Sequence, residues 1–357
     1  MKTPGTKNSE LRTQNSELRT KNIKHRTKNA MKRICFLLLL LLPVVYINAQ
    51  QQTYPKYLTV AQDGSGNYKT IQEAVNAMRD FSQERVTIFI KKGVYHEKLV
   101  VPSWKTNITL LGESRDGTII TNDDFSGKPL PQGQDTASGR DKYSTFNSYT
   151  VIVKGNDFRA ENLTIQNSAG PVGQAVALHA EGDRCEIINC RLLGNQDTLY
   201  VGIDSSRQYY KNCFIEGTTD FIFGPATCVF QNCTIKSLRN SYITAASTTP
   251  RQAYGFVFFD CTLIADTATH KVLLGRPWRP YARTVYINTK MGEHIAPIGW
   301  DNWRNPENEK TAFYAEYNSS GPGANTSGRA AWSHQLTKEE AKLYTLKNIF
   351  GDWVPSE

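Results

Sequence analysis

The segments NCRLLGNQD (residues 189–197) and NCFIEGTTD (residues 212–220) follow one pattern. Each starts with asparagine and cysteine, has an aliphatic residue two places after the cysteine, and ends on an aspartate. A broader form of this start, with Asn or Asp followed by Cys or Leu, occurs five times, and successive copies begin 20 to 28 residues apart. The copies begin at Asn162, Asn189, Asn212, Asn232 and Asp260. A repeat of this length with loops of unequal size is typical of a solenoid.

The segments between these copies are short and rich in β-branched and aromatic residues. Runs such as residues 108–111, 151–153 and 257–259 predict strands. No amphipathic stretch of about 10–15 residues separates them, which excludes an alternating α/β fold. The sequence therefore predicts an all-β, single-domain parallel β-helix. Capping boxes at TIQE (residues 70–73) and TKEE (residues 337–340) predict short capping helices at the two ends of the solenoid.

The first fifty residues do not belong to this repeat. Residues 1–30 are polar and basic, contain the near-duplication NSELRT, and show no apolar period, so we expect a disordered leader or a mis-annotated start. In residues 31–50, two basic residues are followed by an apolar run and then by small residues. This order is typical of a secretory signal peptide. We expect translation to start at Met31 and cleavage to follow Ala49 or Gln50. The mature chain, residues 51–357, is then secreted to the extracellular space or periplasm, without a membrane span.

The net charge depends on this division. The whole chain carries +9, but the first fifty residues hold ten Lys or Arg and two Glu, which contribute +8. The remainder has 32 basic and 31 acidic residues, a net charge of +1. A nucleic-acid partner is therefore not expected.

Six cysteines remain after residue 50, and four of them share one position of the repeat: Cys190, Cys213, Cys233 and Cys261. An even number in an exported protein leaves disulfides open. The shared inward register instead favours buried thiols that act as small apolar side chains. No Cys-x-x-Cys or His-rich cluster is present, so we expect no metal and no cofactor.

Asp197 and Asp220 each lie seven residues after the repeat cysteine. Equal register in a parallel β-helix stacks them on adjacent coils, about 4.8 Å apart in backbone. Two carboxyl groups at so short a distance have different pKa values. One can then act as a nucleophile while the other carries a proton. Alternatively, the two aspartates occur at this position only because turns favour Asp. Asn240, which is also seven residues after a repeat cysteine, supports this alternative.

Six blocks of the sequence resemble signature segments of pectin methylesterases, in the expected order. They are GVYHE (93–97), GQAVAL (173–178), GNQDTLY (194–200), GTTDFIFG (217–224), LGRPW (274–278) and GPGA (321–324). The resemblance extends from Tyr57 to Trp353. It implies a right-handed parallel β-helix and a pectinesterase that hydrolyses the methyl esters of homogalacturonan to pectate and methanol.

The resemblance also implies roles for individual residues. Asp220 would be the nucleophile, and Asp197 the general acid and then the general base. Gln174 and Gln196 would donate hydrogen bonds to the oxyanion, and Arg276 would keep Asp220 ionised by lowering its pKa.

The same resemblance implies how substrate is held. Trp278, Phe221 and Thr145 would contact methyl-esterified homogalacturonan, and we expect a monomer. Tyr149 stands where the family more usually has a small residue, which could reshape the groove.

Three other β-helix classes remain open from the residues alone. A polysaccharide lyase would need carboxylates that hold calcium and a basic catalytic residue. A galacturonase would need two acids about 6.5–9.5 Å apart. A surface adhesin would need none of the residues named above.

Overall fold

The computed structural model describes residues 6–40, 54–131, 139 and 141–356. The chain divides into two units, Met1–Thr53 and Tyr54–Glu357. In the first unit, α1 (Thr6–Leu40) is one helix, where the sequence predicted disorder for residues 1–30. Its residues are mostly good helix formers, but its described side chains are exposed, so it has no core of its own. Of the segment predicted to be a signal peptide, residues 41–50 lie outside the described residues.

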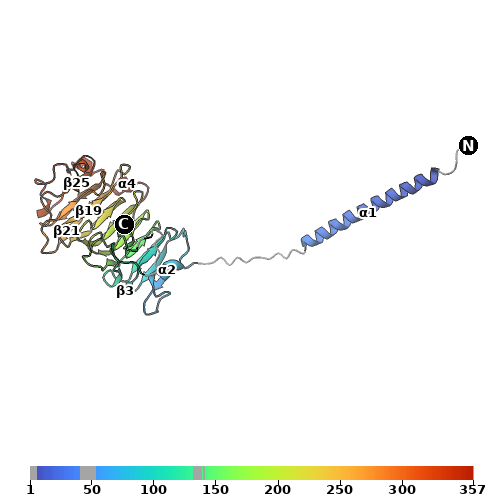
Figure 1. Ribbon diagram of the computed structural model, residues 1–357, viewed down its shortest axis with the longest axis horizontal. Coiled ribbons are helices and arrows are strands. Elements are labelled where there is room, and N and C mark those ends of the chain that lie inside the picture. Colours follow the sequence, from blue (N-terminus) through green and yellow to red (C-terminus); the bar gives the residue numbers. More distant parts are fainter. Residues whose placement is uncertain (1–5, 41–53, 132–138, 140, 357) are drawn as a thin grey trace. The chain divides into compact units, whose positions relative to one another are not determined.

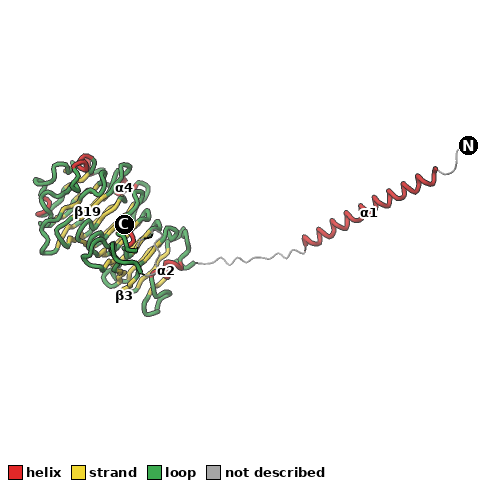
Figure 2. The backbone as a smooth tube through the Cα atoms, viewed as in Figure 1, coloured by secondary structure: helices red, strands yellow, loops and turns green. Residues whose placement is uncertain are grey.

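The second unit consists of three parallel sheets, whose strands follow one another as the chain coils (Figures 1 and 2). Sheet A contains β1 (Tyr57–Val60), β2 (Val86–Ile90), β5 (Ile108–Gly112), β8 (Arg159–Glu161), β11 (Cys185–Ile188), β14 (Arg207–Lys211), β17 (Thr227–Gln231), β20 (Phe256–Phe259), β23 (Arg283–Ile287), β25 (Phe313–Tyr317) and β26 (His334–Gln335). Sheet B contains β3 (Gly93–His96), β6 (Thr118–Asn122), β9 (Thr164–Asn167), β12 (Arg191–Leu193), β15 (Phe214–Gly217), β18 (Thr234–Ser237), β21 (Thr262–Ala265) and β24 (Lys290–Met291). Sheet C contains β4 (Leu99–Val101), β7 (Val151–Val153), β10 (Leu178–Ala180), β13 (Leu199–Val201), β16 (Ile222–Gly224), β19 (Tyr242–Ala246) and β22 (Leu273–Gly275).

The repeated Asn or Asp marks the bend between sheets A and B. The five repeat residues Asn162, Asn189, Asn212, Asn232 and Asp260 have φ between 49° and 57°. Among residues with a side chain, Asn and Asp adopt this left-handed conformation at the lowest cost. The repeat read from the sequence is therefore a bend required once per coil, which confirms the predicted parallel β-helix.

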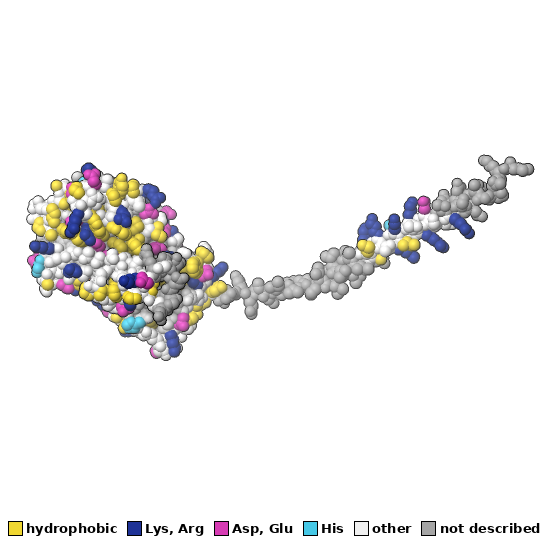
Figure 3. All heavy atoms as spheres, in the orientation of Figure 1, with side chains coloured by type: hydrophobic (Ala, Val, Ile, Leu, Met, Phe, Trp, Pro, Cys, Tyr) yellow, Lys and Arg dark blue, Asp and Glu magenta, His cyan; other side chains and the backbone are white. Residues whose placement is uncertain are grey.

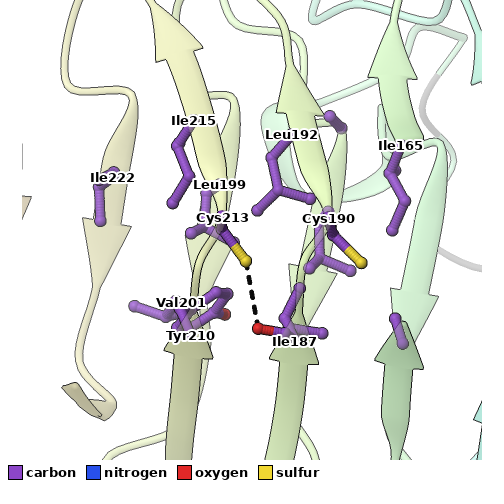
Figure 4. Close-up of a cluster of buried hydrophobic side chains, with 14 of the residues drawn as sticks. Ile165, Ile187, Cys190, Leu192, Leu199, Val201, Tyr210, Cys213, Ile215 and Ile222 are labelled. Atoms are coloured by element: carbon purple, nitrogen blue, oxygen red, sulfur yellow. Dashed lines mark hydrogen bonds between the residues drawn. The ribbon is translucent and has the colours of Figure 1, made fainter. Parts of the chain in front are cut away.

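The residue after each bend points into the coil. Cys190, Cys213, Cys233 and Cys261 are free and buried, as predicted. Figure 4 shows two of these cysteines beside a row of aliphatic side chains, Ile165, Leu192 and Ile215, on neighbouring strands. On the sheet A side, Tyr210, Phe230, Phe258 and Tyr286 form a continuous stack with ring centroids 4.3–4.7 Å apart. The core is thus built of like residues stacked from coil to coil.

The amino-terminal end is capped as predicted. The capping box at Thr70 opens α2 (Ile71–Ala77), whose apolar side chains join the core. At the other end, the capping box at Thr337 opens α3 (Lys338–Ala341), and a separate helix, α4 (Leu346–Phe350), follows.

The position of α4 differs from the expected end cap. Ile349 and Phe350 pack against Tyr209, Val229 and Val257, which lie on the outer face of sheet A in the middle of the coil. The reason is a strip of apolar side chains that this face exposes to α4.

A buried ion pair lies in the last coils. The Glu316 carboxylate is 1% exposed and accepts hydrogen bonds from Arg329 Nε at 2.8 Å, Arg329 Nη2 at 3.0 Å and Trp300 Nε1 at 3.2 Å. Because its partners satisfy it, this carboxylate closes the end of the core without an uncompensated charge.

Replacing Glu316 by alanine should lower the free energy of unfolding by about 3–5 kcal/mol, since Arg329 would remain buried without its counter-ion. Thermal unfolding followed by circular dichroism measures this loss. The matched control is Glu339→Ala, which removes the exposed partner of Lys342 and should leave the melting temperature nearly unchanged. Equal effects of the two substitutions would contradict a special role for the buried pair.

Surface charge in the two units agrees with the division made from the sequence. Figure 3 shows basic and acidic side chains interspersed on the visible face of the coiled unit, whereas the described part of α1 displays mainly Lys and Arg. Among the residues described, no helix is both long and apolar enough to cross a membrane.

Candidate active site

Asp197 and Asp220 stand in the turns that lead into neighbouring strands of sheet C, β13 and β16. Leu199 pairs with Ile222 across these strands, which places the two aspartates in the same register. Asp197 N donates to Thr219 O at 3.1 Å, so the turns also stack. The carboxylates therefore lie on adjacent coils, as the repeat predicted.

The turn itself favours Asp at both positions, because Asp197 and Asp220 have φ of 66° and 49°. Asn240 is not their equivalent in the next coil. The register partner of Asp220 there is Tyr242, whose carbonyl accepts from Asp220 N at 2.9 Å. Asn240 instead accepts hydrogen bonds from the backbone N–H groups of His270 and Lys271. The seven-residue spacing from the repeat cysteine therefore does not lead to the position of the two aspartates in this coil.

The environments of the two acids are unequal. Both are buried, with 5% of Asp197 and 6% of Asp220 exposed. Arg276 holds Asp220 by two hydrogen bonds, Nε to Oδ1 at 3.0 Å and Nη2 to Oδ2 at 2.6 Å. Such a bidentate pair favours the ionised carboxylate.

Burial raises the pKa of Asp197 to about 8, with a further rise from the negative charge of Asp220. Burial also raises the pKa of Asp220 above its ordinary value, and the hydrogen bonds and charge of Arg276 oppose this rise. Arg276 therefore lowers the pKa of Asp220, in the expected direction, but the effect of burial is larger and the net change is a rise. Asp197 is the carboxyl that keeps its proton at neutral pH.

Gln174 and Gln196 lie directly upstream in the same stack of turns. They form an isolated parallel bridge, and Ala175 N donates to Gln196 O at 3.1 Å. Their backbones are thus paired, while their partly exposed side chains line the same pocket as the acids.

This pocket has a volume of about 270 Å³. Seven of the eight predicted site residues line it: Thr145, Gln174, Gln196, Asp197, Asp220, Arg276 and Trp278. They come from three turns that precede strands of sheet C, from the segment that follows β22, and from the 3-10 helix η1 (Thr145–Asn147). The fold brings them together at the outer face of sheet C.

Phe221 is the exception, and its predicted contact with substrate is wrong. Its side chain is 0% exposed and belongs to the core, whereas Phe223 lines the pocket. The left-handed turn at Asp220 interrupts the strand alternation, so that Phe221 and Ile222 both point inward and Phe223 points out.

Three aromatic residues that line the pocket, Phe146, Phe223 and Trp303, were not among the predicted site residues. Phe146, Tyr200, Phe223 and Trp278 form a row along sheet C, with successive ring centroids 5.2, 4.8 and 5.9 Å apart. Tyr200 and Phe223 are register partners on neighbouring strands. The sequence contains a signal for this pairing, because each residue follows a repeat aspartate by three positions.

Trp303 also lines the pocket but had no such signal, because it comes from an irregular loop. Tyr149, the unusual bulky residue, contacts Lys98 and His179 beside the row.

No group of three or more His, Cys, Asp or Glu side chains suited to a metal ion occurs within the described ranges.

The fold and the site together define an enzyme of the parallel β-helix class, with a buried carboxyl pair at the base of a groove lined by aromatic rings. Residues 57–352 match the family model described as Pectinesterase. Pectinesterase 31 of Arabidopsis thaliana is 39% identical over 288 residues, which cover 80% of this chain and 89% of that protein. The chain belongs to the pectinesterase family, a family of carboxylic ester hydrolases.

Solved structures agree in fold. A pectin methylesterase from carrot superposes with a TM-score of 0.73 at 39% identity and covers 82% of this chain and 92% of its own. A pectin methylesterase in complex with a hexasaccharide gives a TM-score of 0.71 at 32% identity, over 84% and 98% of the two chains. The three-sheet coil is the right-handed parallel β-helix of these enzymes, which confirms the fold predicted from the sequence.

Other relatives are longer. The chain covers 49% and 48% of two Arabidopsis thaliana proteins named as pectinesterase/pectinesterase inhibitors, so it spans about half of their length.

Proposed function

We propose that the protein removes methyl groups from homogalacturonan and releases pectate and methanol. The observation that carries this proposal is the asymmetry of the buried carboxyl pair, in which only Asp220 is held by an arginine. One carboxyl is thereby suited to attack and the other to transfer a proton. The similarity to a pectin methylesterase that binds a hexasaccharide supports the choice of substrate.

In the first step, an ionised oxygen of Asp220 attacks the carbonyl carbon of a galacturonate methyl ester. The carbonyl oxygen becomes an oxyanion, to which the side-chain amides of Gln174 and Gln196 donate hydrogen bonds. One such donor is worth about 3 kcal/mol in the transition state. The intermediate then expels the methoxy group, which takes the proton of Asp197 and leaves as methanol.

The second step releases the acyl group from Asp220. Asp197, now ionised, takes a proton from water as the water oxygen attacks the acyl carbon. The bond to Asp220 breaks and restores its carboxylate, and Asp197 is again protonated. The product is released as galacturonic acid, which loses its proton to bulk water and becomes a carboxylate. Covalent catalysis of this kind divides one difficult displacement into two easier ones.

Methanol release from highly methylated homogalacturonan tests the proposal directly. We expect methanol to accumulate while the chain length of the polymer stays constant. A fall in chain length without methanol would point to a lyase or a galacturonase instead.

The pH dependence of kcat/KM should be bell-shaped. Asp220 must be ionised, so activity rises with pH through a pKa above the ordinary range of aspartates. Asp197 must be protonated, so activity falls as the pH rises through about 8. Initial rates of methanol release across this range measure both limbs, and an activity that keeps rising above pH 8 would assign the proton transfer to another group.

We further propose that the chain acts outside the cytoplasm, as a monomer, after removal of residues 1–50 or a part of them. The basic, apolar and small-residue order of residues 31–50 supports export. The free, buried state of the six cysteines from Cys185 to Cys261 means that the coil does not depend on disulfides there.

A further inference from the structure

The guanidinium group of Arg276 lies between two aromatic rings. Its Cζ atom is 3.8 Å from the ring centroid of Trp303 and 4.0 Å from that of Tyr242. Both rings attract the cation, and their faces restrict the guanidinium to one plane. In this arrangement Arg276 directs Nε and Nη2 to the two oxygens of Asp220.

Tyr242 is fixed by the coil itself. It is the first residue of β19, and its carbonyl accepts the hydrogen bond from Asp220 N. Its ring and the Asp220 carboxylate therefore keep their relative position through the sheet.

Trp303 is held in position by the conformation of its loop. Trp303 and Arg304 have φ of 60° and 56°, a region that bulky side chains rarely adopt. The loop is nevertheless held, since Trp303 N donates to Asp301 Oδ1 at 2.7 Å.

The 3-10 helix η2 (Pro306–Lys310) supports the same loop. Asn308 Nδ2 donates to Asn302 O at 3.0 Å, and Asn302 Nδ2 donates to Glu309 Oε1 at 2.7 Å. A strained backbone persists only where its surroundings determine it in this way.

We propose that Trp303 and Tyr242 are positioning residues that act through Arg276. By holding the guanidinium plane between them, they keep both of its hydrogen bonds on Asp220, so that this carboxylate stays ionised and directed at the ester carbon. The inference rests on the proposed roles of Asp220 and Arg276. A free arginine side chain would have to restrict several rotatable bonds to make the same two contacts.

A sugar contact is the other role that Trp303 could have, since it lines the pocket. The two roles affect different kinetic constants. Loss of a uniform sugar contact raises KM with kcat unchanged, whereas loss of an interaction needed in the transition state lowers kcat.

The test compares Trp303→Leu, Trp303→Phe and Tyr242→Leu with the wild type, on highly methylated homogalacturonan. We expect kcat to fall about 10-fold in each leucine variant, with KM changed by less than about 3-fold, and Trp303→Phe to recover most of the loss. The acid limb of the pH profile should move to higher pH, because a loosened Arg276 stabilises ionised Asp220 less. The other charged groups around Asp220, Asp197 and Asp301, are unchanged in these variants.

The matched control is Phe313→Leu, which removes an aromatic ring from Arg283 outside the pocket. Its kcat and pH profile should equal those of the wild type. Combining Trp303→Leu with Arg276→Lys gives a second control, since lysine has no planar group to orient. In that background, the effect of Trp303→Leu should largely disappear.

A rise in KM with an unchanged kcat and an unmoved acid limb would overturn the proposal, because Trp303 would then contact the sugar. A full effect of Trp303→Leu in the Arg276→Lys background would overturn it as well. If Trp303→Leu fails to fold, Tyr242→Leu tests the other face of the same guanidinium. These outcomes all presuppose a wild-type enzyme that releases methanol, so failure of the proposed function is recognised separately.

Discussion

Replacing Asp220 by alanine should lower kcat by about four orders of magnitude or more, because removal of a nucleophile takes away the covalent route and not only a part of its stabilisation. The coil should survive the change. The Asp220 side chain points into the pocket, and Arg276 remains held between Tyr242 and Trp303. Rates of methanol release and circular dichroism of the same sample measure the two expectations together.

The Asp220→Asn variant separates the loss of the carboxylate charge from the loss of the side chain. Asparagine keeps the size of the side chain and can adopt the left-handed backbone that position 220 requires. It lacks the charge, so we expect a similar loss of kcat with a near-normal melting temperature. Wild-type turnover in either variant would show that the nucleophile is misassigned, and a large loss of stability in both would indicate a structural role.

Asp197→Asn should lower kcat by about 10²–10⁴-fold, since an amide cannot deliver the proton to departing methanol. The same substitution should make the protein more stable at neutral and alkaline pH. Burial raises the pKa of Asp197 from 3.8 in its ordinary state to about 8, so the folded protein binds a proton that the unfolded chain has already lost.

The sign follows from this difference in bound protons. Between pH 3.8 and about 8, the folded state binds more protons than the unfolded state, and wild-type stability therefore declines as the pH rises. Asparagine does not titrate, so the variant should lack this decline and melt at a higher temperature than the wild type at pH 8. Equal melting temperatures of the two proteins across the range would mean that Asp197 is not forced to remain protonated. The combination of lost activity and gained stability is typical of a catalytic group held in an unfavourable environment.

Some parts of this site could be predicted from the sequence because they follow from the backbone of one coil. The repeat aspartates share a turn with positive φ, and turn geometry is a local property. Their stacking then follows from the constant spacing of parallel coils. Gln174 and Gln196 belong to the same stack, and the family resemblance adds Arg276 from two coils further on.

Other parts could not be predicted, since they depend on contacts between distant segments. Phe221 and Phe223 are equivalent in a simple alternating pattern, and only the turn at Asp220 decides which of them faces the pocket. Trp303 reaches Arg276 from a loop that has no repeat. The net rise of the Asp220 pKa depends on how deeply the carboxylate is buried, and the sequence does not give this depth.

The sequence by itself determined the coil, the bend at each repeat asparagine, the cysteine ladder and the pairing of Asp197 with Asp220, because each is a local preference repeated at constant spacing. The tertiary structure decided which ring lines the groove, where α4 packs, and how Arg276 is clamped between Tyr242 and Trp303. These features arise from burial and from contacts across many coils, and such long-range packing leaves no periodic signal in the sequence.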